Sequence, residues 1–257
     1  MKIKTILTPA ELPRLAQRDL HQTACVVFDI LRATSTFVTA LHHGATAIVP
    51  VSEIAEAIAL RNRQPEVLLA GERDGLKIRA AIASGIDFNF GNSPREFTAE
   101  MVCGKTIVST TTNGTRALRA CAGAKCVLAA AFLNLTATAE FLRRKSFAEI
   151  LLVCAGTGDG VALEDVLAAG AMIELFTARG DARPTLSDSS QVAWKNFSNR
   201  KLDSTEGLSA AIGDSQNGRR LLAIPDLRDD VAFCAQRDIV DLVAGLGADG
   251  WLRQIRA

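Results

Sequence analysis

The stretch Cys25-Val26-Val27-Phe28-Asp29-Ile30-Leu31-Arg32-Ala33-Thr34 passes from a strand-like apolar run directly into a polar loop. Three other apolar runs also end in loops rich in Gly, Thr, Asn and carboxylates. They are residues 67–70 before 71–75, 106–109 before 110–116, and 151–154 before 155–160. In a parallel α/β sheet, the loops that follow the strands emerge at one edge, where ligands bind. The four loops are therefore predicted to converge on one site, whose residues suit an anion and a hard metal ion.

Strand and helix patterns alternate along most of the chain at the spacing of βαβ units. The predicted strands are 24–28, 46–51, 66–70, 105–109, 126–130 and 149–154. The predicted helices are 33–43, 52–63, one starting at Ser93-Pro94, 114–121, 134–145, 162–178, 188–197, 205–213 and 238–246. We expect one α/β domain over residues 1–257, with three α/β/α layers and a mostly parallel sheet. Its more polar segment 180–225 is expected to form a helical C-terminal elaboration.

Composition sets limits on partners and location. The chain has 257 residues, is 48% hydrophobic and carries a formal net charge of +1, which gives no reason to expect a nucleic-acid or anionic-membrane partner. No apolar run approaches the roughly 20 residues of a membrane span, and the first residues are too weakly apolar for a signal peptide. The six cysteines lack metal-site or redox spacing, so we expect reduced thiols. The protein is expected to be cytoplasmic and, on base rates, a homo-oligomer.

Asp29 is the first candidate for chemistry. A carboxylate directly after a buried strand is costly unless it meets a metal, a cation or hydrogen-bond donors. Arg32 follows it at the start of a helix, whose free N–H groups favour an anion. A helix cap paired with Arg32 would explain the same residues without any function. A haloacid-type phosphatase would need a second Asp at position 31, where this chain has Leu31.

The next two loops suit a metal and an anion. Glu72, Arg73 and Asp74 stand between two glycines, and magnesium usually takes one or two carboxylates with water and phosphate. A solvated turn with self-paired charges is the alternative. Residues 110–116 gather hydroxyls, Asn113 and Arg116 into a cradle for a phosphate, sulfonate or carboxylate. A Thr-rich cap with a tight Asn-Gly turn would be the structural explanation.

The fourth loop, 155–160, leads into Glu164-Asp165 in the first turn of a helix. Ordinary helix-dipole complementarity explains these two acids, and Asp165 becomes a ligand candidate only together with the other loops. Neither this loop nor residues 110–116 has the spacing of a dinucleotide-binding or phosphate-binding nucleotide loop. A nucleotide-dependent enzyme is therefore disfavoured.

Together these segments resemble the 2-phosphosulfolactate phosphatase family of coenzyme M biosynthesis. The matching pieces occur in family order over nearly the whole chain: 29–35, 71–78, 90–96, 110–117, 155–157 with 164–165, and 233–234 with 237–240. The resemblance implies a magnesium-dependent acid phosphatase with its own α/β/α fold. It also implies Mg²⁺ as the cofactor and a small anionic phosphorylated hydroxy acid, bearing sulfonate and carboxylate, as the substrate.

The resemblance also assigns residues. It implies that Asp29, Glu72 and Asp165 are the metal-binding and catalytic acids, with Arg32 beside them. The matched anion binders are Arg32, Arg73, Asn92, Ser93, Thr111, Asn113, Thr115 and Arg116. The chain departs from the family in a longer stretch at 78–90. A longer wall there would reshape the pocket and change the preferred substrate while leaving the type of reaction unchanged.

These assignments lead to a mechanistic hypothesis. Magnesium held by two or three of the acids binds a phosphate oxygen, and the arginines help neutralise the charge of the transferring phosphoryl group. Asp29 is the best candidate for a covalent nucleophile, and a metal-activated water is equally compatible with the sequence. One alternative is a phosphatase for another small organophosphate. The other is a non-catalytic anion-binding protein, which would not need several acids at its rim.

Overall fold

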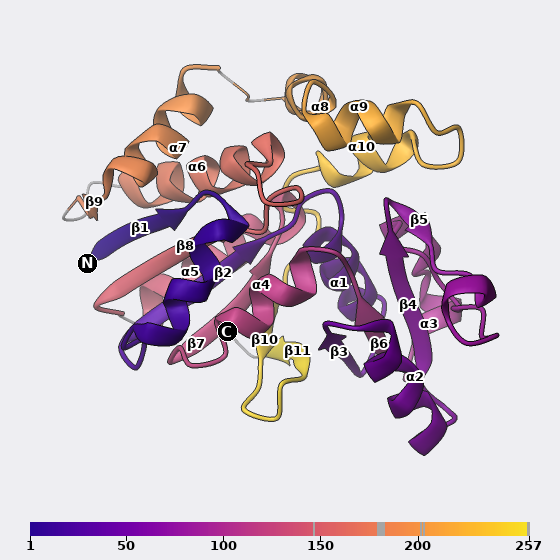
Figure 1. Ribbon diagram of the computed structural model, residues 1–257. Helices are drawn as coiled ribbons and strands as arrows, with labels where there is room; N and C mark the ends of the chain where they lie inside the picture. The colour runs from indigo at the N-terminus through magenta and orange to yellow at the C-terminus, as the bar shows by residue number, and fades with distance from the viewer. Residues whose placement is uncertain (146, 179–182, 201, 203, 256–257) are drawn as a thin grey trace.

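The computed structural model describes residues 1–145, 147–178, 183–200, 202 and 204–255. Its described strands form one mixed, mostly parallel sheet in the order β5-β4-β6-β3-β11-β10-β7-β2-β8-β1-β9 (Figure 1). These strands are β1 (Lys2–Ile6), β2 (Thr23–Phe28), β3 (Ala47–Val51), β4 (Leu68–Arg73), β5 (Leu76–Lys77), β6 (Thr106–Thr110), β7 (Cys126–Ala130), β8 (Glu149–Cys154), β9 (Thr185–Leu186), β10 (Val243–Leu246) and β11 (Leu252–Ile255). The predicted α/β class and mostly parallel sheet are confirmed.

The helices cover the sheet and form an added layer near one end of it (Figure 1). They are α1 (Ala33–His42), α2 (Ile54–Arg63), α3 (Ala99–Val102), α4 (Gly114–Ala120), α5 (Leu135–Lys145), α6 (Leu163–Thr177), α7 (Asp188–Ser198), α8 (Thr205–Gly213), α9 (Gln216–Leu222) and α10 (Asp229–Cys234). The predicted elaboration at 180–225 is mostly helical where the structure describes it, with the short strand β9 near its start, and its residues 180–182, 201 and 203 lie outside the described part. Among the described residues, no helix combines the length and apolarity that crossing a membrane requires.

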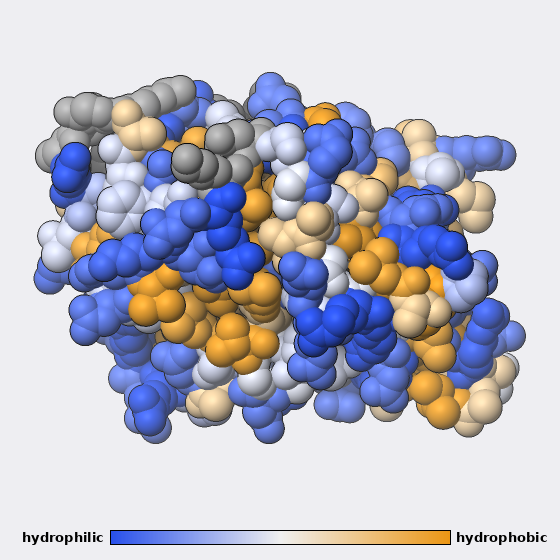
Figure 2. Space-filling model, turned by 90° about the horizontal axis from the view of Figure 1, so that it is seen from above, coloured by the Kyte–Doolittle hydropathy of each residue, from blue (hydrophilic) through white to orange (hydrophobic). Residues whose placement is uncertain are grey.

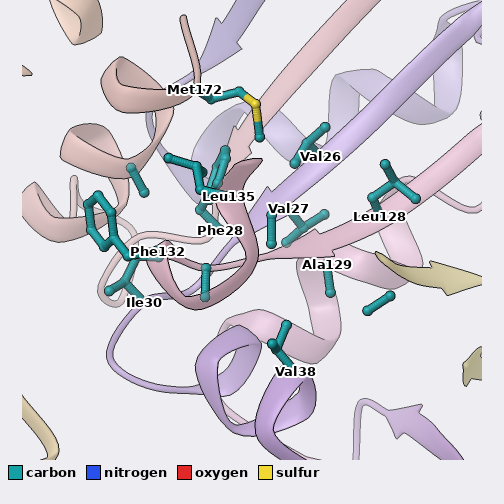
Figure 3. Packing of buried hydrophobic residues seen from close by; sticks show 14 of the residues in the cluster. Val26, Val27, Phe28, Ile30, Val38, Leu128, Ala129, Phe132, Leu135 and Met172 are labelled. Atoms are coloured by element: carbon teal, nitrogen blue, oxygen red, sulfur yellow. The ribbon is translucent and has the colours of Figure 1, made fainter. Parts of the chain in front are cut away.

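Strand β2 fixes the position of the functional loops. All six of its residues are buried, and it pairs in parallel with β7 and β8. Phe28 stands level with Cys154, so the loops after β2 and β8 leave the sheet side by side. Figure 3 shows Val26, Val27 and Phe28 surrounded by apolar side chains from neighbouring strands and helices. Each such buried side chain contributes about 1.5–3 kcal/mol of apolar burial, which holds the end of the strand in place.

A second pair of strands brings the other two loops together. β4 runs parallel to β6, and Gly71 stands level with Thr110 at their carboxyl ends. The longer segment 78–90 packs at this side of the sheet, where Ile78 and Phe88 belong to a small apolar cluster with Val108. Seen from above, the surface of the molecule mixes hydrophilic and hydrophobic residues (Figure 2).

Two local predictions differ from the structure, and one strand near the start of the chain was not predicted. The helix predicted at 238–246 is wrong, because Val243–Leu246 forms strand β10, antiparallel to both β7 and β11 in the middle of the sheet. The start signal at Ser93-Pro94 produces only a 3-10 turn, Pro94–Glu96, before the short α3. The leading segment forms a strand, β1, that pairs with β8 and β9. Short apolar runs fit a helix or a strand equally well, and their partners here are distant in sequence.

Candidate active site

A cavity of about 270 Å³ opens where the four loops meet helix α9. The structure thus confirms that the loops converge on one place. The lining residues, grouped by segment along the chain, are Asp29, Leu31 and Arg32; Glu72, Asp74 and Gly75; Asn92; Thr112 and Asn113; Gly156, Thr157 and Gly158; and Asn217, Arg220 and Leu221. Such a polar pocket at the carboxyl ends of parallel strands is the usual ligand site of an α/β sheet.

Asp29 is held at the end of β2 with one oxygen fixed and one oxygen free. Its Oδ1 accepts a hydrogen bond of 3.1 Å from the Ala33 N–H at the start of α1, and its own N–H donates to Thr34 Oγ1. Within the described chain, Oδ2 accepts no hydrogen bond. That oxygen lies against Gly114, where an added Cβ would be only 2.5 Å away. Gly114 thus leaves room for the free oxygen of a nine-tenths buried carboxylate.

Burial governs the charge of Asp29. The pKa of its carboxyl is raised from the ordinary value of 3.8 to about 7, first because burial disfavours the charged form. The Ala33 N–H opposes this rise, and the neighbouring charges of Glu72 and Glu164 add to it. A positive charge beside these acids would return them to the ionised form.

Arg32 forms a buried ion pair with Asp230 of helix α10. Its Nη1 lies 2.6 Å from Asp230 Oδ2, and its Nη2 donates to the Gly75 carbonyl at 2.7 Å. Asp230 is fully buried and also accepts a hydrogen bond of 2.7 Å from Ser93 Oγ. The Leu31–Arg32 peptide bond is cis. The pair therefore ties the loop after β2, the loop after β4 and the helical layer into one unit.

The Glu72 carboxylate links the loop after β4 to the loop after β6 through hydrogen bonds. Its Oε2 accepts from the Gly75 N–H at 2.7 Å, and its Oε1 accepts from both the N–H and the hydroxyl of Thr112 at 2.9 Å. An ionised carboxylate oxygen can accept about two hydrogen bonds, so Oε2 keeps one acceptor position. Glu72 lines the cavity together with Asp29 and Asp74.

Asp165 and Glu164 lie behind the cavity wall at the start of α6. Asp165 accepts from the N–H groups of Ile30 at 2.8 Å and Gly156 at 3.0 Å, which joins the loops after β2 and β8. Glu164 Oε1 accepts from Asn217 Nδ2 at 2.7 Å, whereas its buried Oε2 has no hydrogen-bond partner in the described chain. Burial is the first cause that raises the pKa of each acid, and the negative charges of Glu164 and Asp29 raise that of Asp165 further.

The predicted anion binders separate into two groups. Arg32, Asn92 and Asn113 line the cavity. The others lie outside its wall: Arg73 donates to the Thr110 hydroxyl, Ser93 to Asp230, Thr111 and Thr115 bond to one another, and Arg116 is exposed. Asn113 donates to the carbonyls of Ala155 and Gly158, so its amide group also shapes the neighbouring loop.

Asn217, Arg220 and the positioning residue Asp230 were missed from sequence. The first two belong to a segment treated only as part of the helical layer. The polar run Gln216-Asn217-Gly218-Arg219-Arg220 was the available signal, since its amide and guanidinium groups can donate hydrogen bonds to an anion. For Asp230 the signal was weaker, because Asp229-Asp230 at a helix start also suits the helix dipole.

The raised pKa of Asp29 predicts a pH-dependent stability of the metal-free protein. Between its ordinary value of 3.8 and about 7, the folded state keeps a proton that the unfolded state has released. Stability should therefore fall as the pH rises through this window, by an amount on the order of 2–4 kcal/mol. Thermal unfolding in a chelator at pH 5 and pH 8 measures it. A Tm that stays constant or rises would contradict the assigned environment of Asp29, and Asp29→Asn should flatten the dependence.

Comparisons with known proteins point to one family. The family model described as 2-phosphosulpholactate phosphatase matches residues 7–248. A Thermotoga maritima protein is 40% identical over 222 residues, 86% of this chain and 88% of its own length. A Caldicellulosiruptor saccharolyticus protein is 37% identical, covering 93% and 95%, and a Clostridium perfringens protein is 34% identical, covering 95% and 92%. All three bear the name "Probable 2-phosphosulfolactate phosphatase". The chain belongs to the 2-phosphosulpholactate phosphatase family.

Proposed function

We propose that this protein hydrolyses 2-phosphosulfolactate to sulfolactate and phosphate, with magnesium, in the cavity at the end of β2. The observation that carries the proposal is the placement of Asp29. One oxygen of this buried carboxylate is fixed by a helix N–H, and the other accepts no hydrogen bond in the described chain and belongs to a residue that lines the cavity together with Arg32. A carboxylate and a guanidinium fixed together in a cavity suit the transfer of a phosphoryl group. Membership of the family supports the choice of substrate.

The charges of the cavity fit a divalent cation. Its lining carries three carboxylates, Asp29, Glu72 and Asp74, against two guanidinium groups, Arg32 and Arg220. A substrate with phosphate, sulfonate and carboxylate groups would meet net repulsion there without additional positive charge. In the described chain, no group of three or more His, Cys, Asp or Glu side chains could hold a metal ion. Magnesium needs only one or two protein carboxylates when water and phosphate complete its shell.

Among the buried carboxylates that line the cavity, free acceptor positions support Asp29 and Glu72 as the residues that would hold magnesium. When bound, the cation would supply positive charge to offset the charge that develops on the phosphoryl oxygens. Asp165 has both oxygens bonded to backbone N–H groups and supports the loops from behind. Its predicted role as a metal ligand remains a prediction.

Two routes start from this arrangement. In the covalent route, Asp29 Oδ2 attacks phosphorus, and Oδ1, which keeps one acceptor position, would face the cation. The ester P–O bond breaks, and the electron pair leaves on the sulfolactate oxygen, which takes a proton from water. Water then hydrolyses the aspartyl phosphate and releases inorganic phosphate. In the direct route, water attacks phosphorus, the ester P–O bond breaks, and the proton of the attacking water passes to the sulfolactate oxygen, while Asp29 Oδ2 would hold the cation. Arg32 stabilises the phosphoryl charge in both, and Asp230 holds Arg32 in place.

The proposal is tested by phosphate release from 2-phosphosulfolactate, phospholactate and phosphoglycerate, with magnesium or with a chelator. We expect the highest kcat/KM for 2-phosphosulfolactate and a loss of at least about 100-fold in the chelator, restored by added magnesium. Release that is unchanged by the chelator would remove the metal from the proposal. No release from any of these esters would refute the phosphatase assignment, and a maximum on another ester would refute the substrate.

A further inference from the structure

Helix α9 places a guanidinium group at the mouth of the cavity. Asn217, Arg220 and Leu221 are three and four residues apart, so they share one face of the helix, and all three line the cavity. Their helix belongs to the C-terminal layer rather than to the four loops that follow the strands. The cavity therefore has a second wall, which faces the residues assigned to the phosphoryl group.

Arg220 differs from Arg32 in its partners. The guanidinium of Arg32 is committed to Asp230 and to the Gly75 carbonyl. Arg220 donates to Asn217 Oδ1 at 3.2 Å, and it makes no ion pair with a carboxylate in the described part of the chain. A guanidinium has five N–H donors, so most of those on Arg220 are available to a ligand.

Asn217 orients Arg220 from behind. Its Nδ2 donates to Glu164 Oε1 at 2.7 Å and to Thr157 Oγ1 at 2.6 Å, which uses both amide hydrogens. The amide oxygen of this nine-tenths buried side chain is therefore fixed toward Arg220. If the Asn217 amide group rotated by half a turn, it would lose its hydrogen bonds to Glu164 and Thr157. Its oxygen therefore stays in place as an acceptor for the Arg220 guanidinium.

Gly75 stands between the two guanidinium groups. Its carbonyl accepts from Arg32, and a Cβ at its position would lie 3.5 Å from Arg220 Nη2. Two like charges that approach one residue repel each other, and a bound anion with two negative ends relieves that repulsion. Such a ligand would place one end near Asp29 and Arg32 and the other near Arg220.

We propose that Arg220 binds the acid group of the substrate, its sulfonate or carboxylate, and thereby selects phosphorylated hydroxy acids over simple phosphate esters. This inference rests on the proposed phosphatase function. It adds the residue that binds the non-reacting sulfonate or carboxylate end of the substrate. Arg32 serves the phosphoryl end, and Arg220 serves the other end. Asn217 is a positioning residue for Arg220.

The test uses the two reaction products, sulfolactate and inorganic phosphate, to probe separately the acid-group end and the phosphoryl end of the cavity. Sulfolactate carries the acid groups without the phosphate, and inorganic phosphate carries the other end alone. In Arg220→Gln, we expect the inhibition constant of sulfolactate and the KM for 2-phosphosulfolactate to rise about 10-fold or more. The kcat and the inhibition constant of phosphate should stay within about twofold, because Arg220 does not contact the phosphoryl group. Arg220→Lys should recover part of the loss, since it keeps the charge without the planar fork.

Arg219→Gln is the matched control. Arg219 is the exposed neighbour of Arg220, donates to the Asp214 carbonyl and does not line the cavity. Wild-type constants are expected for this variant. A variant Arg220→Gln with a lower kcat and weaker phosphate binding but unchanged sulfolactate binding would overturn the proposal, as would wild-type constants throughout. If the wild type released no phosphate, the proposed function would fail. The role of Arg220 would still be decided by calorimetry, which compares the binding of sulfolactate to the wild type and to Arg220→Gln.

Discussion

The Asp29→Asn protein is expected to fold like the wild type and to release phosphate at least about 1,000-fold more slowly. Among the described carboxylates that line the cavity, only Asp29 has one oxygen held by a backbone N–H while its other oxygen accepts no hydrogen bond. Asparagine keeps the acceptor for the Ala33 N–H but removes the negative charge. Neither covalent attack nor metal binding survives this change. Steady-state phosphate release at saturating magnesium measures the loss.

Stability separates this loss from misfolding. In the metal-free protein the pKa of Asp29, raised to about 7, shows that burial disfavours its charged form, and asparagine resembles the neutral form. The variant should therefore unfold at a Tm equal to or above that of the metal-free wild type at pH 8. Retained activity in a folded Asp29→Asn protein would exclude Asp29 from the chemistry. Acid quenching of wild-type turnover then distinguishes the routes, because only covalent attack leaves phosphate on Asp29.

Replacing Asp230 by alanine is expected to lower the free energy of unfolding by about 3–5 kcal/mol. Arg32 is 3% exposed, so the substitution leaves a buried guanidinium without the carboxylate that it contacts. The same change leaves Ser93 Oγ without its acceptor. Denaturant unfolding followed by circular dichroism measures the effect, and phosphate release should fall as well because Arg32 loses its orientation.

Asp229→Ala is the matched control for this prediction. Asp229 precedes Asp230 in α10, but its side chain is 66% exposed and lies 3.5 Å from Arg95, which is also exposed. Exposed pairs of this kind contribute about 0–1 kcal/mol. Similar losses in the two variants would mean that the first turn of α10, rather than the buried pair with Arg32, accounts for the effect.

Much of the fold could be predicted because its determinants are local. A buried strand such as β2 reads as a continuous apolar run, and the helices between strands show their own period and end signals. The strand β10 could not be predicted in this way. Its residues join the middle of the sheet only because β7 and β11 lie on either side, and Gly245 allows the close approach of Ile255.

The residues of the site also fall into those that local sequence predicts and those that depend on distant contacts. Asp29, Glu72 and Asn113 could be predicted because each lies at or just after the carboxyl end of a strand, where the sheet decides which way the loop leaves. Asp230 and Arg220 reach the site from α10 and α9, about 190–200 residues after Asp29 in sequence. No local pattern encodes which face of a short helix meets a distant loop. Arg73 and Arg116 show the converse, since both stand in the right loops and neither lines the cavity.

The most direct test of the account is a crystal structure of the protein grown with manganese, as an anomalous-scattering substitute for magnesium, and inorganic phosphate. The account predicts one manganese ion bonded to carboxylate oxygens of both Asp29 and Glu72 and to an oxygen of the phosphate, with the phosphate also contacting Arg32. A manganese ion bound at other residues, or phosphate bound at a distance from Asp29, would contradict it.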